Sequence, residues 1–183
     1  HASAGALLST IAVAARRASL TGFEFAGGIP GTLGGAVVMN AGAYGGEMKD
    51  VLRKVMVMDQ SGKVFEIPAE ELQMGYRTSI IKTAGYIVLG AVLSLNEGNL
   101  EEIKMLTRKL SEQRTSNQPL EYPSAGSTFK RPEGYFAGKL IMDSGLRGYR
   151  VGGAQVSEKH CGFVINAGGA TARDVRTLMD NVR

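Results

Sequence analysis

Three stretches of this 183-residue sequence contain side chains that could do chemistry. Arg77, in the stretch YRTSIIK, is either a surface cation or a bidentate clamp for a carboxylate. Ser127, in PSAGSTFKRP, follows a glycine and has the basic pair Lys130 and Arg131 just beyond it; the plain interpretation is a turn serine followed by a solvated charge pair. His160 is followed by Cys161, and a lone histidine is more often structural than a ligand. If this segment is a strand, the two side chains point to opposite faces and form no catalytic dyad.

A glycine-rich run over residues 27–46 raises a different possibility, because eight of its twenty positions are glycine. The run contains neither the GKS or GKT ending of a P-loop nor GxGxxG, so no standard nucleotide motif applies. Glycines spaced three apart leave backbone N–H groups unshielded, and such groups can lie against a flat ring or hold a phosphate. The alternative is a pair of tight turns. Tyr44, near the end of the run, is either a core residue or a ligand contact.

The composition limits the partners. The 21 Lys and Arg exceed the 17 Asp and Glu by four, and they form no basic stripe, so the charge suits an anionic small ligand at least as well as DNA or RNA. We expect a small-molecule partner and no nucleic acid. The single cysteine excludes a disulfide framework and a CxxC metal site, and we expect no metal. No apolar run approaches the roughly 20 residues that span a bilayer, and no signal peptide is present. These features predict a cytoplasmic protein without membrane contact.

The elements that must position these residues follow from the hydrophobic pattern. Residues 4–18 have helical spacing, and VMVMD and KVFEI around the turn 60–62 predict a hairpin. The run YIVLGAVLSL predicts a strand buried on both faces. Asn99 with Glu102 has the form of a capping box, which opens a helix to about residue 114. A domain boundary is expected at TSNQP.

Beyond that boundary the pattern predicts a short helix near 136–144, strands at GAQVS and GFVIN, and a helix from Thr171. The apolar face of the last helix would consist of Val175, Leu178, Met179 and Val182. The sequence therefore predicts an α+β fold in two parts, 1–114 and 118–183.

Five motifs together resemble the UDP-N-acetylenolpyruvoylglucosamine reductase (MurB) family of bacterial peptidoglycan synthesis, in order and over nearly the whole chain. They are GIPGTLGGAVVMNAGAYGGE, YRTSIIK, AGSTFKRP, AGKLIMDSGLRGYRVGGAQVSEKHCGFVIN and ATARDV. The direct passage from YIVLGAVLSL into the helix resembles the shorter of the family's two forms. The resemblance implies a partial FAD-binding domain of the vanillyl-alcohol-oxidase (PCMH) type over 1–114, followed by a MurB-type C-terminal substrate domain over 118–183.

The resemblance also implies a reaction and a set of site residues. NADPH would reduce FAD, and hydride would then pass to UDP-N-acetylglucosamine enolpyruvate, which becomes UDP-N-acetylmuramate. Arg77 matches the family's arginine that stabilises the substrate carboxylate, and Ser127 matches its proton-donating serine. The cofactor-binding residues would be Gly28, Ile29, Pro30, Gly31, Thr32, Gly34, Gly35, Asn40 and Gly42. The substrate-binding residues would be Tyr44, Gln118, Lys130, Arg131 and His160, with Lys130 also able to assist Ser127.

Two features of the family's pattern are missing from this sequence. These are the N-terminal subdomain with its pyrophosphate-binding loop and the C-terminal tail with its acidic catalytic residue. We therefore expect a truncated, monomeric piece of a longer enzyme that binds FAD poorly by itself. One alternative is a non-catalytic module that binds a UDP-sugar or flavin. A serine hydrolase built on Ser127 and His160 is disfavoured, because no GxSxG elbow and no third member are evident.

Overall fold

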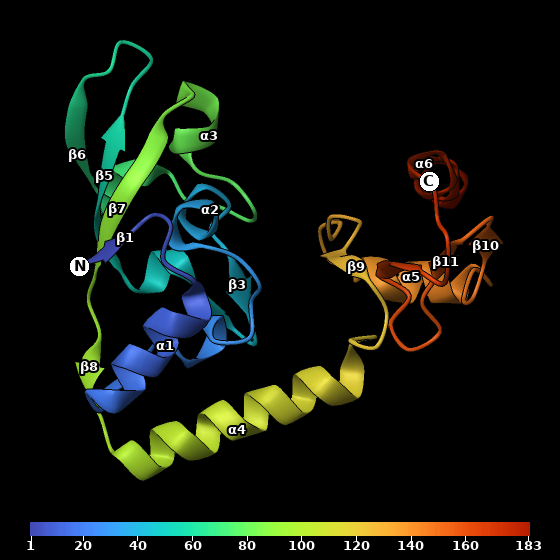
Figure 1. Cartoon of the computed structure of the whole chain (residues 1–183), viewed down its shortest axis with the longest axis horizontal. Coiled ribbons are helices and arrows are strands. Elements are labelled where there is room, and N and C mark those ends of the chain that lie inside the picture. Colours follow the sequence, from blue (N-terminus) through green and yellow to red (C-terminus); the bar gives the residue numbers. More distant parts are fainter. The chain divides into compact units, whose positions relative to one another are not determined.

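The computed structural model describes residues 1–183, which form two compact units, residues 1–112 and 113–183 (Figure 1). Each unit combines helices with antiparallel strands, so the predicted α+β class is confirmed. Unit 1 contains β1 (Ala2–Ser3), α1 (Leu8–Arg17), β2 (Leu20–Thr21), η1 (Glu24–Ala26), α2 (Leu33–Val38), β3 (Gly42–Ala43), β4 (Gly46–Glu47), η2 (Met48–Asp50), β5 (Leu52–Met58), β6 (Val64–Pro68), η3 (Ala69–Leu72), α3 (Ile80–Ala84), β7 (Ile87–Leu93) and β8 (Asn96–Glu97). The helix α4 (Leu100–Asn117) leads into unit 2, which contains β9 (Ser124–Ser127), α5 (Ala137–Asp143), β10 (Arg150–Val151), β11 (Ala154–Val156), β12 (Phe163–Asn166) and α6 (Ala172–Val182).

The main sheet of unit 1 has the order β1-β7-β5-β6, with every neighbouring pair antiparallel. Its hairpin β5–β6 confirms the one predicted around residues 60–62, with Val55 opposite Ile67. Val55, Val57 and Ile67 point to the same face and are buried there. That face joins a core with the largest fully buried side chains of the unit, Leu8, Phe23, Leu33, Val37, Met48, Leu72 and Ile81.

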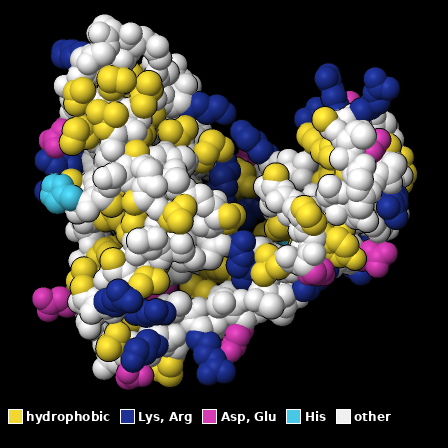
Figure 2. All heavy atoms as spheres, viewed as in Figure 1, with side chains coloured by type: hydrophobic (Ala, Val, Ile, Leu, Met, Phe, Trp, Pro, Cys, Tyr) yellow, Lys and Arg dark blue, Asp and Glu magenta, His cyan; other side chains and the backbone are white.

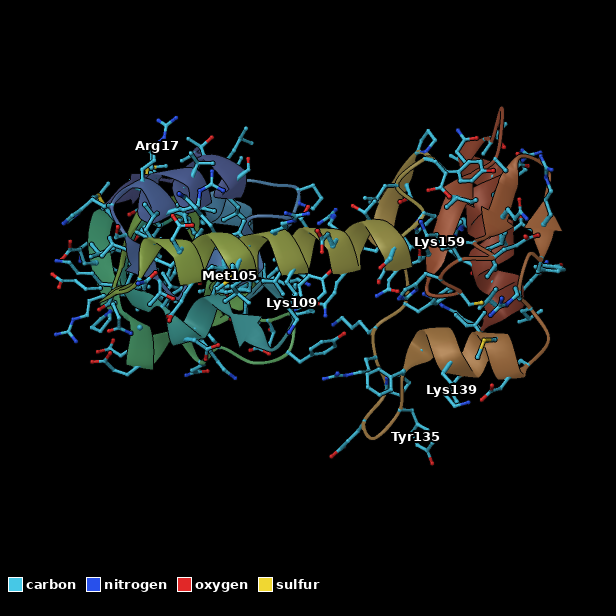
Figure 3. All side chains as sticks on the ribbon, turned by 90° about the horizontal axis from the view of Figure 1, so that it is seen from below. Arg17, Met105, Lys109, Tyr135, Lys139 and Lys159 are labelled. Atoms are coloured by element: carbon cyan, nitrogen blue, oxygen red, sulfur yellow. The ribbon has the colours of Figure 1, made fainter.

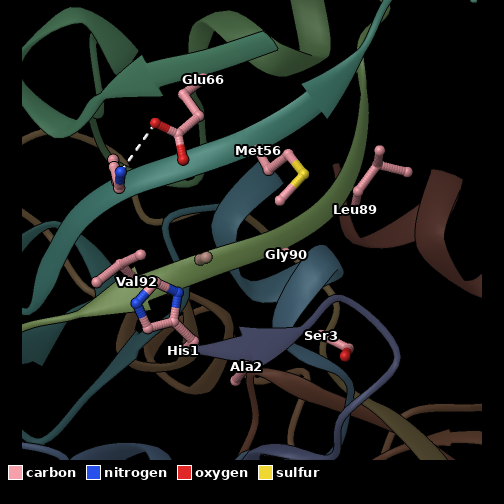
Figure 4. Close-up of a pocket in the computed structure, with 10 residues that line it drawn as sticks. His1, Ala2, Ser3, Met56, Glu66, Leu89, Gly90 and Val92 are labelled. Carbon is pink, nitrogen blue, oxygen red and sulfur yellow. Dashed lines mark hydrogen bonds and ion pairs between the residues drawn. The ribbon is translucent and has the colours of Figure 1, made fainter. Parts of the chain in front are cut away.

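The strand β7 is not buried on both faces, and that prediction is wrong. Val57 lies opposite Val88 and Met56 opposite Gly90, so that Leu89 is the extra residue of a β-bulge. The bulge leaves Leu89 on the outer face of the sheet, where it lines a pocket of about 250 Å³ with Met56 (Figure 4). Hydrophobic side chains gather on the surface over these strands (Figure 2). A continuous apolar run therefore did not require two covered faces.

The helix α4 begins where the sequence predicted it and runs three residues further than the predicted end at 114, to Asn117. The Oδ1 of Asn99 accepts hydrogen bonds from the backbone N–H of Glu101 and Glu102, at 2.9 and 3.2 Å, which confirms the N-cap. The division between the units falls inside this helix. Of its apolar side chains only Ile103 is buried, and Met105 is 65% exposed (Figure 3). None of the helices combines the length and apolar character needed to cross a membrane.

Unit 2 has one sheet in the order β10-β11-β12-β9, and the helices and strands predicted in this part are confirmed. Thr171 and Asp174 form a reciprocal capping box at the start of α6. From this helix Leu178 is fully buried, and it packs with a small cluster of buried side chains: Ile141, Ala154, Val156, Cys161 and Val164. This core is much smaller than that of unit 1.

Candidate functional site

A pocket of about 340 Å³ lies beside the glycine-rich run in unit 1. It brings Arg77 together with six of the predicted cofactor-binding residues: Ile29, Pro30, Gly31, Thr32, Gly35 and Gly42. Four further residues that the sequence did not predict also line it: Leu8, Ala36, Met39 and Ala41. Their small or apolar side chains carry no sign of function in the sequence. Folding alone brings them close to Arg77, which is far away in the sequence.

The backbone around α2 fixes one wall of this pocket. Leu8 N donates to the Gly31 carbonyl at 3.1 Å, which ties the start of α1 to the run. The first amides of α2 donate to the segment before α1, Leu33 N to Ala6 O and Gly34 N to Ala4 O, both at 2.9 Å. These two N–H groups therefore have partners within the chain. They are not free to donate to a ligand.

The glycines of the run divide into two groups by what a methyl group would contact. At Gly34 an added Cβ would lie 3.1 Å from the Cβ of Ala4, and at Gly46 it would lie 2.7 Å from the Phe25 ring. Close packing inside the chain therefore explains these positions. At Gly31 and Gly35 an added Cβ would contact nothing within 4 Å, although both residues line the pocket. At Gly31 the backbone φ of 145° already favours glycine, and at Gly42, which also lines the pocket, an added Cβ would lie 2.7 Å from Glu47 Cγ. Only at Gly35 does neither packing nor a positive φ require glycine, and there a closely approaching ligand would. Gly28, also predicted as cofactor-binding, is exposed and lies outside the lining.

The guanidinium of Arg77 is held in place by backbone carbonyls of the glycine-rich run. Its Nη1 donates to Asn40 O at 3.1 Å and its Nη2 to Gly42 O at 2.7 Å. The residue occupies a two-residue turn with a φ of 56°, a left-handed conformation that disfavours most side chains. The guanidinium also lies 5.0 Å from the centroid of the Tyr76 ring. Such fixed contacts are unusual for a free surface cation and suit the clamp interpretation.

Glu47 is a negatively charged side chain that is connected to Arg77 through Asn40. Its Oε2 accepts from Asn40 Nδ2 at 2.7 Å and lies 3.2 Å from Lys49 Nζ. Partial burial alone would raise the pKa of Glu47. Hydrogen bonds from Lys49 and Asn40, together with the charges of Lys49 and Arg77, outweigh burial and set the pKa below its ordinary value. The carboxylate is therefore ionised at neutral pH.

Tyr44 lies at the tip of the β3–β4 hairpin, in a two-residue turn with Gly45. Both residues have positive φ, 54° and 89°, as a type I′ turn requires. The side chain is 44% exposed, so Tyr44 is not the core residue that one interpretation allowed. A tyrosine held in this conformation at an exposed tip remains a candidate ligand contact.

In unit 2, Ser127 ends β9, where it pairs with Phe163 of β12, and its side chain is exposed. Lys130 and Arg131 follow in an exposed loop, and the Arg131 guanidinium lies 5.5 Å from the Phe136 ring centroid. Tyr135, in the same loop ahead of α5, projects away from the ribbon (Figure 3). Gln118 directly follows α4. Arg77 and Ser127 belong to different units, and their joint action stays a prediction.

His160 and Cys161 lie in a turn before β12, so the premise that they form part of a strand is wrong. Cys161 is buried in the core of unit 2, whereas His160 is partly exposed. His160 Nδ1 accepts from the Gly162 N–H at 3.1 Å, and a neutral ring then carries its proton on Nε2. A Ser–His–Asp triad needs the opposite, with Nδ1–H donated to a carboxylate, so the geometry disfavours a hydrolase.

The described residues contain no group of three or more His, Cys, Asp and Glu side chains arranged to hold a metal ion. The buried polar side chains have partners inside the chain, and no buried side-chain nitrogen or oxygen lacks a hydrogen bond. The chemistry that the structure offers is therefore that of one fixed cation beside an apolar pocket in unit 1, and of exposed hydroxyl, imidazole and basic groups in unit 2.

Comparisons with known proteins assign families to both parts. Residues 1–68 match the FAD binding domain family, and residues 118–183 match the C-terminal domain family of UDP-N-acetylenolpyruvoylglucosamine reductase. The chain is 62% identical to a UDP-N-acetylenolpyruvoylglucosamine reductase of Lachnoclostridium phytofermentans, over 98% of this chain and 58% of that protein. It is 59% identical to one of Clostridioides difficile, over 97% of this chain and 59% of that protein.

A solved structure agrees with these matches. The crystal structure of the UDP-N-acetylenolpyruvylglucosamine reductase (MurB) from Thermus caldophilus has a TM-score of 0.90 and 42% identity to this chain, and it covers 98% of this chain and 66% of its own. The chain spans about three fifths of the length of the curated relatives named above. Residues 118–183 thus belong to the C-terminal domain family of UDP-N-acetylenolpyruvoylglucosamine reductase, and the chain is similar over nearly its whole length to reductases of that name.

Proposed function

We propose that the chain carries the flavin-facing and substrate-binding parts of an enzyme that reduces UDP-N-acetylglucosamine enolpyruvate to UDP-N-acetylmuramate with NADPH. The observation that carries the proposal is Arg77, fixed by two carbonyls at the wall of a pocket where one lining glycine, Gly35, has no packing reason inside the chain. We also propose that it acts as a cytoplasmic monomer in peptidoglycan synthesis.

The pocket fits the ring system of FAD. Its volume of about 340 Å³ lies near the lower end of the range for ligand pockets, about 300–1,000 Å³. It therefore suits a ring system better than a whole dinucleotide. Gly31 and Gly35 would let the ring approach the backbone, and Ile29 and Pro30 would contact it with apolar surface. FAD, when bound, supplies hydride transfer.

The residues of the chain would then act on the substrate. Arg77 would stabilise the carboxylate of the enolpyruvyl group as its negative charge grows, because a preorganised cation needs little rearrangement. Ser127 would donate a proton to the carbon next to that carboxylate, with Lys130 assisting. The fixed carbonyl contacts of Arg77 leave its orientation settled before the substrate arrives.

Unit 2 has the charge expected of a diphosphate-binding part. It contains ten Lys and Arg and six Asp and Glu, whereas unit 1 contains eleven of each. The net charge of +4 thus lies entirely in unit 2. Arg131 and the Nε2–H of His160 would bind the diphosphate of the UDP-sugar, and Gln118 and Tyr44 would add polar contacts.

Flavin spectroscopy on the protein expressed from its whole gene tests the proposal. We expect the purified protein to absorb as a flavoprotein, to be bleached by NADPH without oxygen, and to recover its absorbance when the enolpyruvyl UDP-sugar is added. Mass spectrometry should identify UDP-N-acetylmuramate as the product. A flavin that NADPH reduces but this substrate does not reoxidise would contradict the assignment of the substrate.

Gly35→Ala separates ligand approach from stability. A methyl group at this position contacts no atom of the chain, and alanine favours a helix by up to about 1 kcal/mol over glycine. We expect the free energy of unfolding to stay the same or to rise, while the dissociation constant of FAD rises at least tenfold. Urea unfolding and flavin-fluorescence titration measure the two quantities.

Gly46→Ala is the matched comparison. Its methyl group would lie 2.7 Å from two ring carbons of Phe25, so this variant should unfold at a lower urea concentration than the wild type. If Gly35→Ala binds FAD as tightly as the wild type, the bare backbone at Gly35 is not a flavin contact.

A further inference from the structure

Asn40 occupies a position where the chain reverses after α2. The amide of Ala41 donates to Ala36 O at 2.9 Å and that of Asn40 to Val37 O at 3.2 Å, which is the Schellman ending of a helix. Asn40 is the left-handed residue of this motif, with a φ of 41°. Asparagine is tolerated there more readily than most residues other than glycine. The backbone explains why a glycine or an asparagine stands here, but not which of the two.

The side chain of Asn40 accounts for the asparagine. It is fully buried, and its amide uses both donors and its acceptor inside the chain. Nδ2 donates to Glu47 Oε2 at 2.7 Å and to Gly75 O at 3.0 Å, and Oδ1 accepts from Lys49 N at 3.0 Å. Both N–H donors and one lone pair of the oxygen are therefore engaged inside the chain. The contacts of this side chain connect three segments that are separate in the sequence.

These contacts meet at Arg77. The turn that holds Arg77 is closed by Gly75 N donating to Thr78 O at 3.2 Å and Thr78 N donating to Gly75 O at 3.3 Å. The Asn40 amide binds this turn at the Gly75 carbonyl, and the Asn40 carbonyl accepts from the Arg77 guanidinium. A single residue thus holds both the backbone and the side-chain end of the arginine.

Glu47 determines which way the Asn40 amide faces. An ionised carboxylate only accepts hydrogen bonds, so it requires the NH₂ end of the amide on its side. That orientation also places the second N–H on Gly75 O and the oxygen on Lys49 N. The Glu47 side chain is 29% exposed, and the backbone of its own hairpin and the η2 capping box hold it in place.

We propose that Asn40 and Glu47 are a positioning pair for Arg77, which hold its turn and guanidinium in the orientation that receives the substrate carboxylate. The role of the pair in the reaction rests on the proposed function of Arg77, whereas its hold on the guanidinium does not. In this proposal the pair acts on the substrate only through Arg77. A misplacement of about 1 Å in a catalytic group can cost about 100-fold in rate. Loss of the pair should therefore slow the substrate step without removing any reacting group.

Asn40→Gly is the sharpest test, because glycine accepts the left-handed backbone and deletes only the side-chain contacts. In the protein expressed from its whole gene, we expect reduction of bound flavin by NADPH to stay within about twofold of the wild type. Reoxidation by the enolpyruvyl UDP-sugar should slow about 10- to 100-fold. Glu47→Gln, which can present an NH₂ group to the Asn40 amide, should slow the same step. Gln73→Gly is the control, since Gln73 also has a left-handed backbone, with a φ of 48°, and is exposed.

Nuclear magnetic resonance of the arginine guanidinium groups gives a readout that does not depend on activity. Two carbonyl partners hinder rotation of the Arg77 guanidinium, so its two Nη groups should give separate ¹⁵N signals, assigned by their loss in Arg77→Lys. We expect these signals to merge in Asn40→Gly and to stay separate in Gln73→Gly. Signals that stay separate in Asn40→Gly would overturn the proposal.

Together, the reoxidation kinetics and the guanidinium signals also distinguish a failure of this proposal from a failure of the proposed function. Merged signals with unchanged reoxidation, in a protein where Arg77→Lys does slow that step, would show that the positioning is not needed for the reaction. If Arg77→Lys leaves reoxidation unchanged as well, the proposed role of Arg77 fails, and the signals alone decide whether the pair holds the guanidinium.

Discussion

Replacing Ser127 with alanine is expected to slow flavin reoxidation by the enolpyruvyl substrate about 10²- to 10⁴-fold, the usual cost of losing a positioned proton donor. Reduction of the flavin by NADPH should be nearly unchanged, because the hydroxyl would act only on the substrate. The side chain is exposed at the end of β9, so the substitution leaves no cavity in the small core of unit 2. Stopped-flow absorbance of the two half-reactions measures both effects.

Ser124→Ala is the matched control for this experiment, because Ser124 begins the same strand and is also exposed. It should leave both half-reactions at wild-type rates. Equal slowing of the two half-reactions in Ser127→Ala would mean that the hydroxyl supports the protein structure or flavin binding, and the proton-donor role would then be wrong.

Arg77→Lys is expected to lower kcat for the enolpyruvyl substrate about 10²- to 10³-fold, by analogy with the loss of one preorganised donor. Lysine keeps the charge but not the planar fork that donates to Asn40 O and Gly42 O at the same time. The ammonium group would therefore be neither fixed nor bidentate toward a carboxylate. Steady-state kinetics over a range of substrate concentrations separates the effect on kcat from that on KM.

Arg53→Lys serves as the control for a general loss of guanidinium, since Arg53 is an exposed residue of β5 in the same unit. Its kinetics should match those of the wild type. Near-wild-type turnover in Arg77→Lys would show that Arg77 acts as a general cation, and the carboxylate clamp would have to be assigned elsewhere.

The parts of the fold that the sequence predicted well are those stabilised by neighbours in the chain. The hairpin 52–68 follows from strand alternation around one turn, and the start of α6 was predicted at Thr171, where the structure shows a cap formed with Asp174 three residues later. The motifs likewise identified the family, because each is a short, specific run of residues. Each of these features depends on residues that lie within a few positions of one another, so it can be recognised in a single sequence.

Features that depend on residues far apart in the sequence could not be predicted from local patterns. The bulge at Leu89 exposes one face of β7, although its sequence is continuously apolar, because the register is set by pairing with β5. Gly34 and Gly35 are adjacent, yet one packs against Ala4 and the other lines the pocket. Asn40 was predicted to contact a cofactor, which stays a prediction; its side chain binds Glu47 and Gly75, the latter 35 positions away, contacts that the sequence did not indicate.

The candidate site shows the same division. Residue type alone indicated that Arg77 could bind a carboxylate, but a surface cation of the same type would have looked identical in the sequence. Its distinguishing property is a guanidinium fixed by carbonyls 35 and 37 positions earlier in the chain, on a turn with a φ of 56°. Chemistry is carried by side-chain type, which the sequence states directly. Preorganisation depends on contacts between segments that only folding brings together, because hydrogen bonds act over about 3 Å whatever the separation in sequence.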